Sequence, residues 1–467
     1  MSDINITKLD FTEKLIDFAL NFRTEDIPQE VLDFQKTVLI DSIGVMTAAS
    51  TLEPAVKPFL QYAAENGGGR STIFGTGQKT SRVMAAMANG ALIHALDYED
   101  GHDVSHAHPN TASIPALLAY AEAENKDGRE VLAAMVIASE LSVRLKMCLT
   151  GNDIRDCGWY APPMFASYGA VLGLSRLIGL SKEETLDALS ICVTQISLPG
   201  QSARSRDSVL RGVREALSAK AAAFGVEMAR RGVKARMDQP FEGPFGLFMA
   251  YFRNLYDPQI VFDGLGTRWE CTALRFKAWP CCGTTHGVVD AITSLLQEEP
   301  IDYRKVKRVH IHVNKPHINL LEPAEAKYRP ASLAAAKFSL PFTIALVLKD
   351  GNVTLNSYRE QILSDPEILR LMDTVTYELM PEDTVFPEGS TPDDFVRVEI
   401  TTEHGTYVAR NVISSGSPKK PLSRQQLLEK FKDCMSFGSG TYDTDAIIRA
   451  VDCLDKEGSV KELFARL

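Results

Sequence analysis

The sequence contains few of the residues that build metal sites and disulfide frameworks. Eight cysteines are spread over 467 residues, and none has the paired CxxC spacing of a zinc-binding motif. They are also too sparse for a disulfide framework, so a reducing compartment suits them better. The vicinal pair Cys281–Cys282 is a poor candidate for a redox disulfide, because such a bridge is strained.

Long hydrophobic runs and an excess of positive charge are also missing. The longest apolar run, residues 338–348, is too short to span a bilayer, and the acidic N-terminal segment lacks the apolar core of a signal peptide. A net charge of −10 disfavours nucleic acid and anionic membranes as partners. We therefore expect a soluble, cytoplasmic protein in which any anionic ligand meets a local basic patch.

Residues 11–262 have the periodicity of helices almost throughout. Apolar residues recur every three or four positions, Ala and Leu dominate, and alternating β-branched runs are scarce. Ser181, followed by Glu184 three residues later, predicts a helix start with a capping box.

The pattern changes near Cys271. Residues 305–315 alternate strictly and predict a strand, and residues 395–413 predict a hairpin that turns near His404. Two helix-like segments lie between them. After residue 417 amphipathic helices return, and their apolar faces need a partner.

These patterns predict a mainly α fold with two domains. We expect a large all-helical domain built from both chain ends, residues 1–270 and 418–467, and a smaller α+β lid domain, residues 271–417.

Seven ionisable side chains crowd into residues 97–108, where three of the nine histidines also fall. They are Asp97, Glu99, Asp100, His102, Asp103, His106 and His108. Such density suits proton transfer or metal binding, although the spacing matches no metal template. Capping and turn chemistry is the structural alternative, and a catalytic loop is the functional one.

Two further segments are candidates for anion binding. Arg211 and Arg214 share one helical face and could clamp a dicarboxylate, unless they form a solvated face paired with acidic neighbours. Lys277 precedes the loop PCCGTTH and an apolar helix, where N–H donors could meet an anion. An interdomain elbow with capping threonines explains that loop equally well.

Two tyrosines lie within an apolar, helix-like segment, residues 158–180, one near its start. Tyr160 and Tyr168 could act as acids or hydrogen-bond donors, and either could instead be a core aromatic with a satisfied hydroxyl.

These segments, in this order, resemble the MmgE/PrpD family over nearly the whole chain. The resemblance rests on HALDYEDGH with AHPNTASIPALLAYAE, on GWY with YGAVLGLSRLIGL, on ALSAKAAAFGVEMARRG with FEGPFG, on KAWPCCGTTH, on AAAKFSLPFTIALVLKDG and on GSPKKPLSRQQLLEKFKDC. The family includes 2-methylcitrate dehydratase, cis-aconitate decarboxylase and iminodisuccinate epimerase. The resemblance implies a homodimer, a site between the domains, a small di- or tricarboxylate substrate, and no metal or organic cofactor.

The resemblance also places functional residues. The family's acidic-motif aspartate corresponds to Asp97, and its HP histidine corresponds to His108. The spacing is one residue longer here, so His106 is a rival. The family's loop lysine corresponds to Lys277, and its helix-leading lysine corresponds to Arg211.

Three positions depart from the family pattern. Tyr160 stands where the family has a histidine, Cys282 stands where the decarboxylase has a histidine, and Phe342 replaces the decarboxylase's lid tyrosine. The fold inference survives these changes, whereas the reaction of any one member does not transfer.

We assign roles to these residues on chemical grounds. Cations stabilise the developing carbanion or enediolate, and a base with a pKa near neutrality abstracts the proton. The catalytic set is His108 as base, Asp97 to orient it, Tyr160 as acid and Lys277 as cation; the substrate-binding set is Arg211, Arg214, Cys282 and His106.

The expected function is a cofactor-independent lyase that dehydrates a small hydroxy-polycarboxylate. An epimerase or isomerase of a similar acid is the main alternative, favoured by the change to Tyr160. A decarboxylase is disfavoured by the three departures. A non-catalytic helical scaffold and a metal hydrolase built on the His-Asp loop remain as further alternatives.

Overall fold

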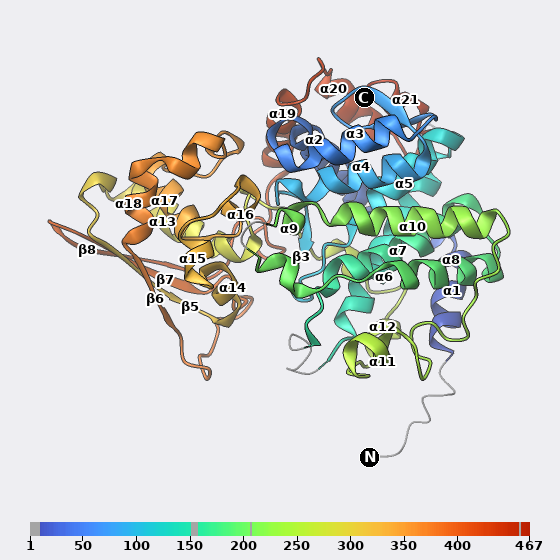
Figure 1. Ribbon diagram of the computed structural model, residues 1–467, viewed down its shortest axis with the longest axis horizontal. Coiled ribbons are helices and arrows are strands. Elements are labelled where there is room, and N and C mark those ends of the chain that lie inside the picture. The colour runs from blue at the N-terminus through green and yellow to red at the C-terminus, as the bar shows by residue number, and fades with distance from the viewer. Residues whose placement is uncertain (1–9, 151–156, 206–207, 457–458) are drawn as a thin grey trace.

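The computed structural model describes residues 10–150, 157–205, 208–456 and 459–467 and shows two parts side by side (Figure 1), each with its own hydrophobic core. The larger core runs from Phe11 to Phe276 and continues in the C-terminal helices, whereas the smaller core lies between Trp279 and Ile400. We call the two parts the helical domain and the small domain. The fold is mainly α with one small sheet-containing domain, which confirms the fold class expected from the sequence.

The helical domain is built around α5 (Asn110–Glu124), which is buried on every side from Asn110 to Ala121. A helix that is apolar all round is typical of a domain centre. Its described helices also include α1 (Phe11–Asn21), α2 (Gln29–Leu52), α3 (Lys57–Glu65), α4 (Arg82–Ala95), α6 (Gly128–Met147), α7 (Ala161–Ile178), α8 (Lys182–Gln195), α9 (Leu210–Val213), α10 (Glu215–Arg230), α11 (Leu247–Phe252) and α12 (Gln259–Phe262). The capping box predicted at Ser181 forms at the start of α8.

Helices α4 and α10 are antiparallel and approach each other very closely at Gly90. A Cβ at this position would lie 2.8 Å from both Ala219 Cβ and the carbonyl oxygen of Glu215. At the opposite end of the pair, Arg82 forms an ion pair with Glu227. The C-terminus of α4 therefore lies beside the N-terminus of α10.

The C-terminal helices return to the helical domain. Helix α19 (Arg424–Ser436) packs on α2, where a Cβ at Gly44 would lie 3.0 Å from the Phe431 ring. Helices α20 (Thr444–Asp452) and α21 (Lys461–Phe464) follow, and α20 also contacts α2. The domain boundaries after residues 270 and 417 stay a prediction.

The small domain holds a four-stranded sheet in the order β6-β5-β7-β8. Strand β5 (Arg308–Val313) pairs in parallel with β6 (Val375–Leu379) and antiparallel with β7 (Val396–Thr402), which forms a hairpin with β8 (Gly405–Asn411). Helices α13 (His286–Glu298) and α17 (Leu340–Asp350) join the strands in one core. The other helices are α14 (Ile318–Leu321), α15 (Ala324–Lys327), α16 (Leu333–Ala336) and α18 (Pro366–Asp373).

The predicted strand and hairpin of this domain are confirmed, but strand β6 and a short hairpin of the helical domain were missed. Strand β6 follows α18 with a single residue between them, so no turn signal separates it from the helix. The hairpin of β1 (Ser71–Ile73) and β2 (Gln78–Thr80) is only three residues long on each side, too short for a periodic signal.

Specific polar contacts join the two domains. Strand β3 (Gly101–His102) pairs with β4 (Leu274–Arg275), so the acidic loop is fixed to the segment that leads into the small domain. Arg275 bridges Asp103 and Asp394 at 2.6 and 3.0 Å. A buried ion pair of 2.8 Å also links Lys337 to Glu53.

Candidate active site

The end of helix α4 shapes the first part of the site. The helix stops at Ala95, and Asp97 adopts a left-handed conformation (φ 49°) in which its N–H donates to the His94 carbonyl at 2.8 Å. Aspartate tolerates this conformation better than most residues do. The tight turn reverses the chain and places Glu99 against the His94 side chain.

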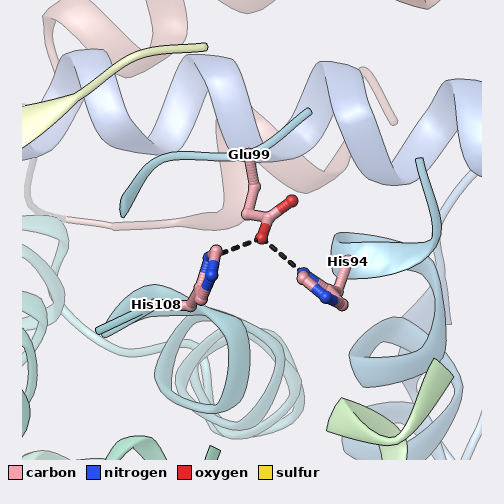
Figure 2. Close-up of side chains that lie close together, drawn as sticks. All are labelled: His94, Glu99 and His108. Carbon is pink, nitrogen blue, oxygen red and sulfur yellow. Dashed lines mark hydrogen bonds and ion pairs between the residues drawn. The ribbon is translucent and has the colours of Figure 1, made fainter. Parts of the chain in front are cut away.

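Glu99 is the centre of a buried acid–base group (Figure 2). Its Oε1 lies 2.5 Å from His94 Nδ1 and 2.9 Å from His108 Nδ1. Burial alone would raise the pKa of Glu99, but His94, Lys277 and His108 together hold that pKa well below its ordinary value. Glu99 is therefore an ionised carboxylate shared by two imidazole rings. The expectation that Asp97 orients His108 is wrong, because Glu99 occupies that place.

Asp97 instead binds Lys277, which brings together two of the predicted residues. The Lys277 ammonium donates to Asp97 Oδ1 and lies 3.9 Å from Glu99 Oε2. Burial favours the neutral amine, yet Asp97 and Glu99 raise the pKa of Lys277 above its ordinary value. Burial would likewise raise the pKa of Asp97, and Lys277 and His94 lower it below the usual range. Both groups thus carry their charge at neutral pH.

Arg211 and Arg214 lie beside this group. Arg211 Nη1 donates to His94 Nε2 at 3.0 Å, and its guanidinium stacks on the Phe338 ring at 3.9 Å. Because an arginine can only donate, His94 Nε2 accepts, and the proton on Nδ1 goes to Glu99. Arg214 Nε donates to Glu215 at 3.2 Å, while its two Nη groups are buried and have no hydrogen-bond partner in the described part of the chain.

The two tyrosines have different surroundings. The Tyr160 ring lies 3.6 Å from the Arg214 guanidinium carbon and 5.0 Å from that of Arg211. Tyr168 is fully buried against Phe165 and Phe241, and burial raises its pKa well above the ordinary value. Tyr160 thus belongs to the site, whereas Tyr168 is a core aromatic.

The remaining predicted residues lie at the edge of the site or outside it. His106 has a left-handed backbone (φ 53°), half of its side chain is exposed, and it lies 3.5 Å from Asp393. The His108 side chain, by contrast, is only 16% exposed. Cys282 is partly buried, and burial and Asp97 raise its pKa, so it is a thiol. Phe342 is buried in the small-domain core and stacks on Tyr358.

The geometry also bears on metal binding. The side chains of His94, Glu99 and His108 have ligand atoms within 4.8 Å of one another, as would suit a divalent ion. However, both ring nitrogens of His94 already take part in hydrogen bonds, and the Lys277 ammonium faces Glu99. The positive charges of Arg211 and Lys277 repel a metal cation and attract an anion, so the three residues suit proton transfer better than metal binding. Metal independence stays a prediction.

Sequence reasoning gave no catalytic role to several residues of the site, although it counted Glu99 in the ionisable cluster. His94 and Glu99 flank Asp97 within HALDYED, so their proximity in sequence was a usable signal for the buried pair. Glu215 directly follows Arg214, which it binds. Phe338 and Lys327 come from the small domain, and no local pattern places them beside Arg211.

This arrangement is of the buried acid–base kind used in proton transfer, with cations arranged for an anionic ligand. The chain matches the MmgE/PrpD N-terminal domain over residues 13–259 and the MmgE/PrpD C-terminal domain over residues 279–456. It therefore belongs to the MmgE/PrpD family, as the sequence motifs led us to expect.

Curated relatives include decarboxylases and a dehydratase. The chain is 26% identical to the cis-aconitate decarboxylase-like protein oryM of Aspergillus oryzae, over 97% of this chain and 96% of the relative. It is 26% identical to cis-aconitate decarboxylase of Aspergillus terreus, over 90% and 88%. It is 24% identical to a probable 2-methylcitrate dehydratase of Saccharomyces cerevisiae, over 72% and 68%. In the described part of the chain, no helix has both the length and the apolar character needed to cross a membrane.

Proposed function

We propose that the protein is a cofactor-independent lyase that abstracts a proton next to a carboxylate of a small hydroxy-polycarboxylate and expels the hydroxyl group. The observation that carries this proposal is the juxtaposition of His108, held by the buried Glu99, with arginine groups that have free donors. A base beside uncommitted cations is what carbanion chemistry next to a carboxylate requires.

His108 is the proposed base. Burial lowers its pKa, Glu99 opposes this, and the net result is a pKa below the ordinary value. The ring is therefore mainly neutral at neutral pH. Because Nδ1 lies 2.9 Å from Glu99 Oε1, Nε2 is the ring nitrogen left to accept the substrate proton. Glu99 then stabilises the imidazolium that forms.

Arg211, Arg214 and Lys277 are the proposed anion-stabilising groups. No carboxylate of the described chain lies within ion-pair distance of Arg211, and Arg214 keeps two free Nη groups. Each guanidinium can hold a carboxylate in bidentate fashion. Lys277 supplies a fixed positive charge close to Glu99, on the side of the base. Charge that builds up on the substrate carboxylate would be stabilised more than the ground state.

Tyr160 is the proposed acid for the leaving hydroxyl. Its ring lies against both guanidinium groups, and a phenol can donate a proton directly or through water. His106 and Cys282 remain proposed only as contacts at the edge of the substrate.

Decarboxylation is the second candidate, because two relatives that match 90% or more of this chain are named cis-aconitate decarboxylase and cis-aconitate decarboxylase-like protein. Against it stand Tyr160, Cys282 and Phe342, and a neutral His108 is a better proton acceptor than donor. Epimerisation would use the same base without loss of a group. A homodimeric assembly and a cytoplasmic location stay predictions from the family resemblance.

One experiment separates these reactions. The protein is incubated in deuterated water with a panel of hydroxylated and unsaturated di- and tricarboxylates, and proton NMR follows each. New alkene signals from a hydroxy acid would support dehydration. Loss of carbon dioxide would favour decarboxylation, and deuterium incorporation alone would favour epimerisation. If no acid reacts or exchanges, while the protein is folded and unaffected by chelators, the proposal fails.

A further inference from the structure

We propose that Lys327, on the small domain, binds a second carboxylate of the substrate and so makes the site selective for acids with at least two carboxylates. This inference rests on the proposed function. It adds a specificity residue that lies across the domain junction from His108.

Lys327 is a buried ammonium without an acidic partner. It ends the short helix α15, is 8% exposed, and donates one hydrogen bond of 3.1 Å to the carbonyl of Phe338. An ammonium has three N–H donors, so two remain for a ligand. No carboxylate of the described chain lies within ion-pair distance of it. Burying an unpaired charge is costly, and a charge of this kind is typical of a site that binds the opposite charge.

Phe338 links Lys327 to the arginines. Its carbonyl accepts from Lys327, and its ring carries the Arg211 guanidinium. The same residue thus contacts both cations. Burial, followed by the charge of Arg211, lowers the pKa of Lys327 to about 8.

The charges of the site also point to a ligand with two negative charges. Asp97 is paired with Lys277, Glu99 with the two imidazoles, and Glu215 with Arg214. Arg211 and Lys327 are the site cations of the described chain that have no carboxylate partner. A monocarboxylate would offset one of them and leave the other buried without a partner, whereas a dicarboxylate would offset both.

Binding of three acids with the same five-carbon chain tests this inference: pentanoate, glutarate and tricarballylate carry one, two and three carboxylates. Isothermal titration should show that the wild-type protein prefers glutarate and tricarballylate over pentanoate. Lys327→Met should reduce that preference about 10-fold or more, the size expected for a lost charged hydrogen bond. Lys327→Arg should retain it, as should Lys305→Met, which removes a lysine paired with Glu403 elsewhere on the small domain.

A pH series gives a second measurement that needs no apolar variant. The titratable groups that face Lys327 are Arg211, which stays charged, and Cys282, whose raised pKa keeps it a thiol. The preference for glutarate should therefore fall between about pH 7 and pH 9 in the wild type and stay constant in Lys327→Arg.

The outcomes are distinguishable. Absence of binding for both polycarboxylates in the wild type would overturn the proposed function. Normal polycarboxylate binding with an unchanged preference in Lys327→Met would overturn only this inference. Equal loss of all three acids would show that Lys327 merely supports the Phe338 backbone. The ligand-free Lys327→Met protein should melt at a temperature equal to or above that of the wild type, because it no longer buries an unpaired charge.

Discussion

His94 joins Arg211 to Glu99: its Nε2 accepts from the guanidinium at 3.0 Å, and its Nδ1 lies 2.5 Å from the carboxylate. Since the same carboxylate oxygen contacts His108, a continuous chain of polar contacts runs from the proposed anion-binding cation to the proposed base. A substitution of Arg211 should therefore also change the electrostatic environment of His108.

Arg211→Ala should lower kcat/KM, because it removes a cation next to the developing charge. The lost transition-state stabilisation should be about 3 kcal/mol. The far-ultraviolet circular dichroism spectrum should be unchanged. Arg211→Lys is the matched control and should keep part of the activity. Near-normal kcat/KM in Arg211→Ala would exclude it from the chemistry.

His108→Asn should abolish deuterium exchange into the substrate, since the Nε2 lone pair is lost while the polar contact to Glu99 can persist. His106→Asn is the paired control and should leave exchange largely intact, because that side chain is half exposed and faces Asp393. The reverse result would make His106 the base.

Activity should rise with pH along a single ionisation whose apparent pKa is below 6.5. Burial lowers the pKa of His108 more than Glu99 raises it, so the imidazole loses its proton at a lower pH than an ordinary histidine does. Glu99→Gln should move the acidic limb to still lower pH and reduce kcat. A limb well above pH 7 in the wild type would contradict this assignment.

Lys277→Met should lower the free energy of unfolding by about 3–5 kcal/mol, because it leaves the Asp97 carboxylate buried without its cation. Asp97→Asn together with Lys277→Met should be clearly more stable than the single lysine variant, since the charges are removed together. Denaturant unfolding of the two single variants and the double variant measures the coupling. Additive effects would mean that the pair contributes no interaction of its own.

Asp100→Asn should stabilise the protein above neutral pH by roughly 2–4 kcal/mol. Burial raises the pKa of Asp100 to about 7, so the folded state binds a proton that the unfolded state has lost. The corresponding stability is present below pH 4 and disappears as the pH rises through 7. The asparagine oxygen can still accept from Asn110, as Asp100 Oδ2 does at 2.7 Å. Parallel pH–stability curves for variant and wild type would refute this.

The sequence was sufficient for the fold class but only partly for the site. Helical and alternating periods predicted the mainly α fold, the strand β5 and the hairpin β7–β8. Lys277 and Asp97 were both singled out, but their pairing arises from the contact between strands β3 and β4, which no local pattern encodes. The partner of His108 was misassigned because the left-handed turn at Asp97, a backbone property, turns Glu99 rather than Asp97 toward the ring.

The close approach of α4 and α10 depends on Gly90, a residue that has no side chain to take part in the chemistry. Gly90 leaves the two backbones so near that even a methyl group would meet Glu215 O and Ala219 Cβ. The Glu215 side chain forms an ion pair with Arg214, and His94 lies one helical turn after Gly90 in α4. Gly90 thus acts as the spacer that sets the gap between His94 and the arginines. The distance between helices α4 and α10, set by a residue without a side chain, therefore determines whether His94 and the arginines can come into contact.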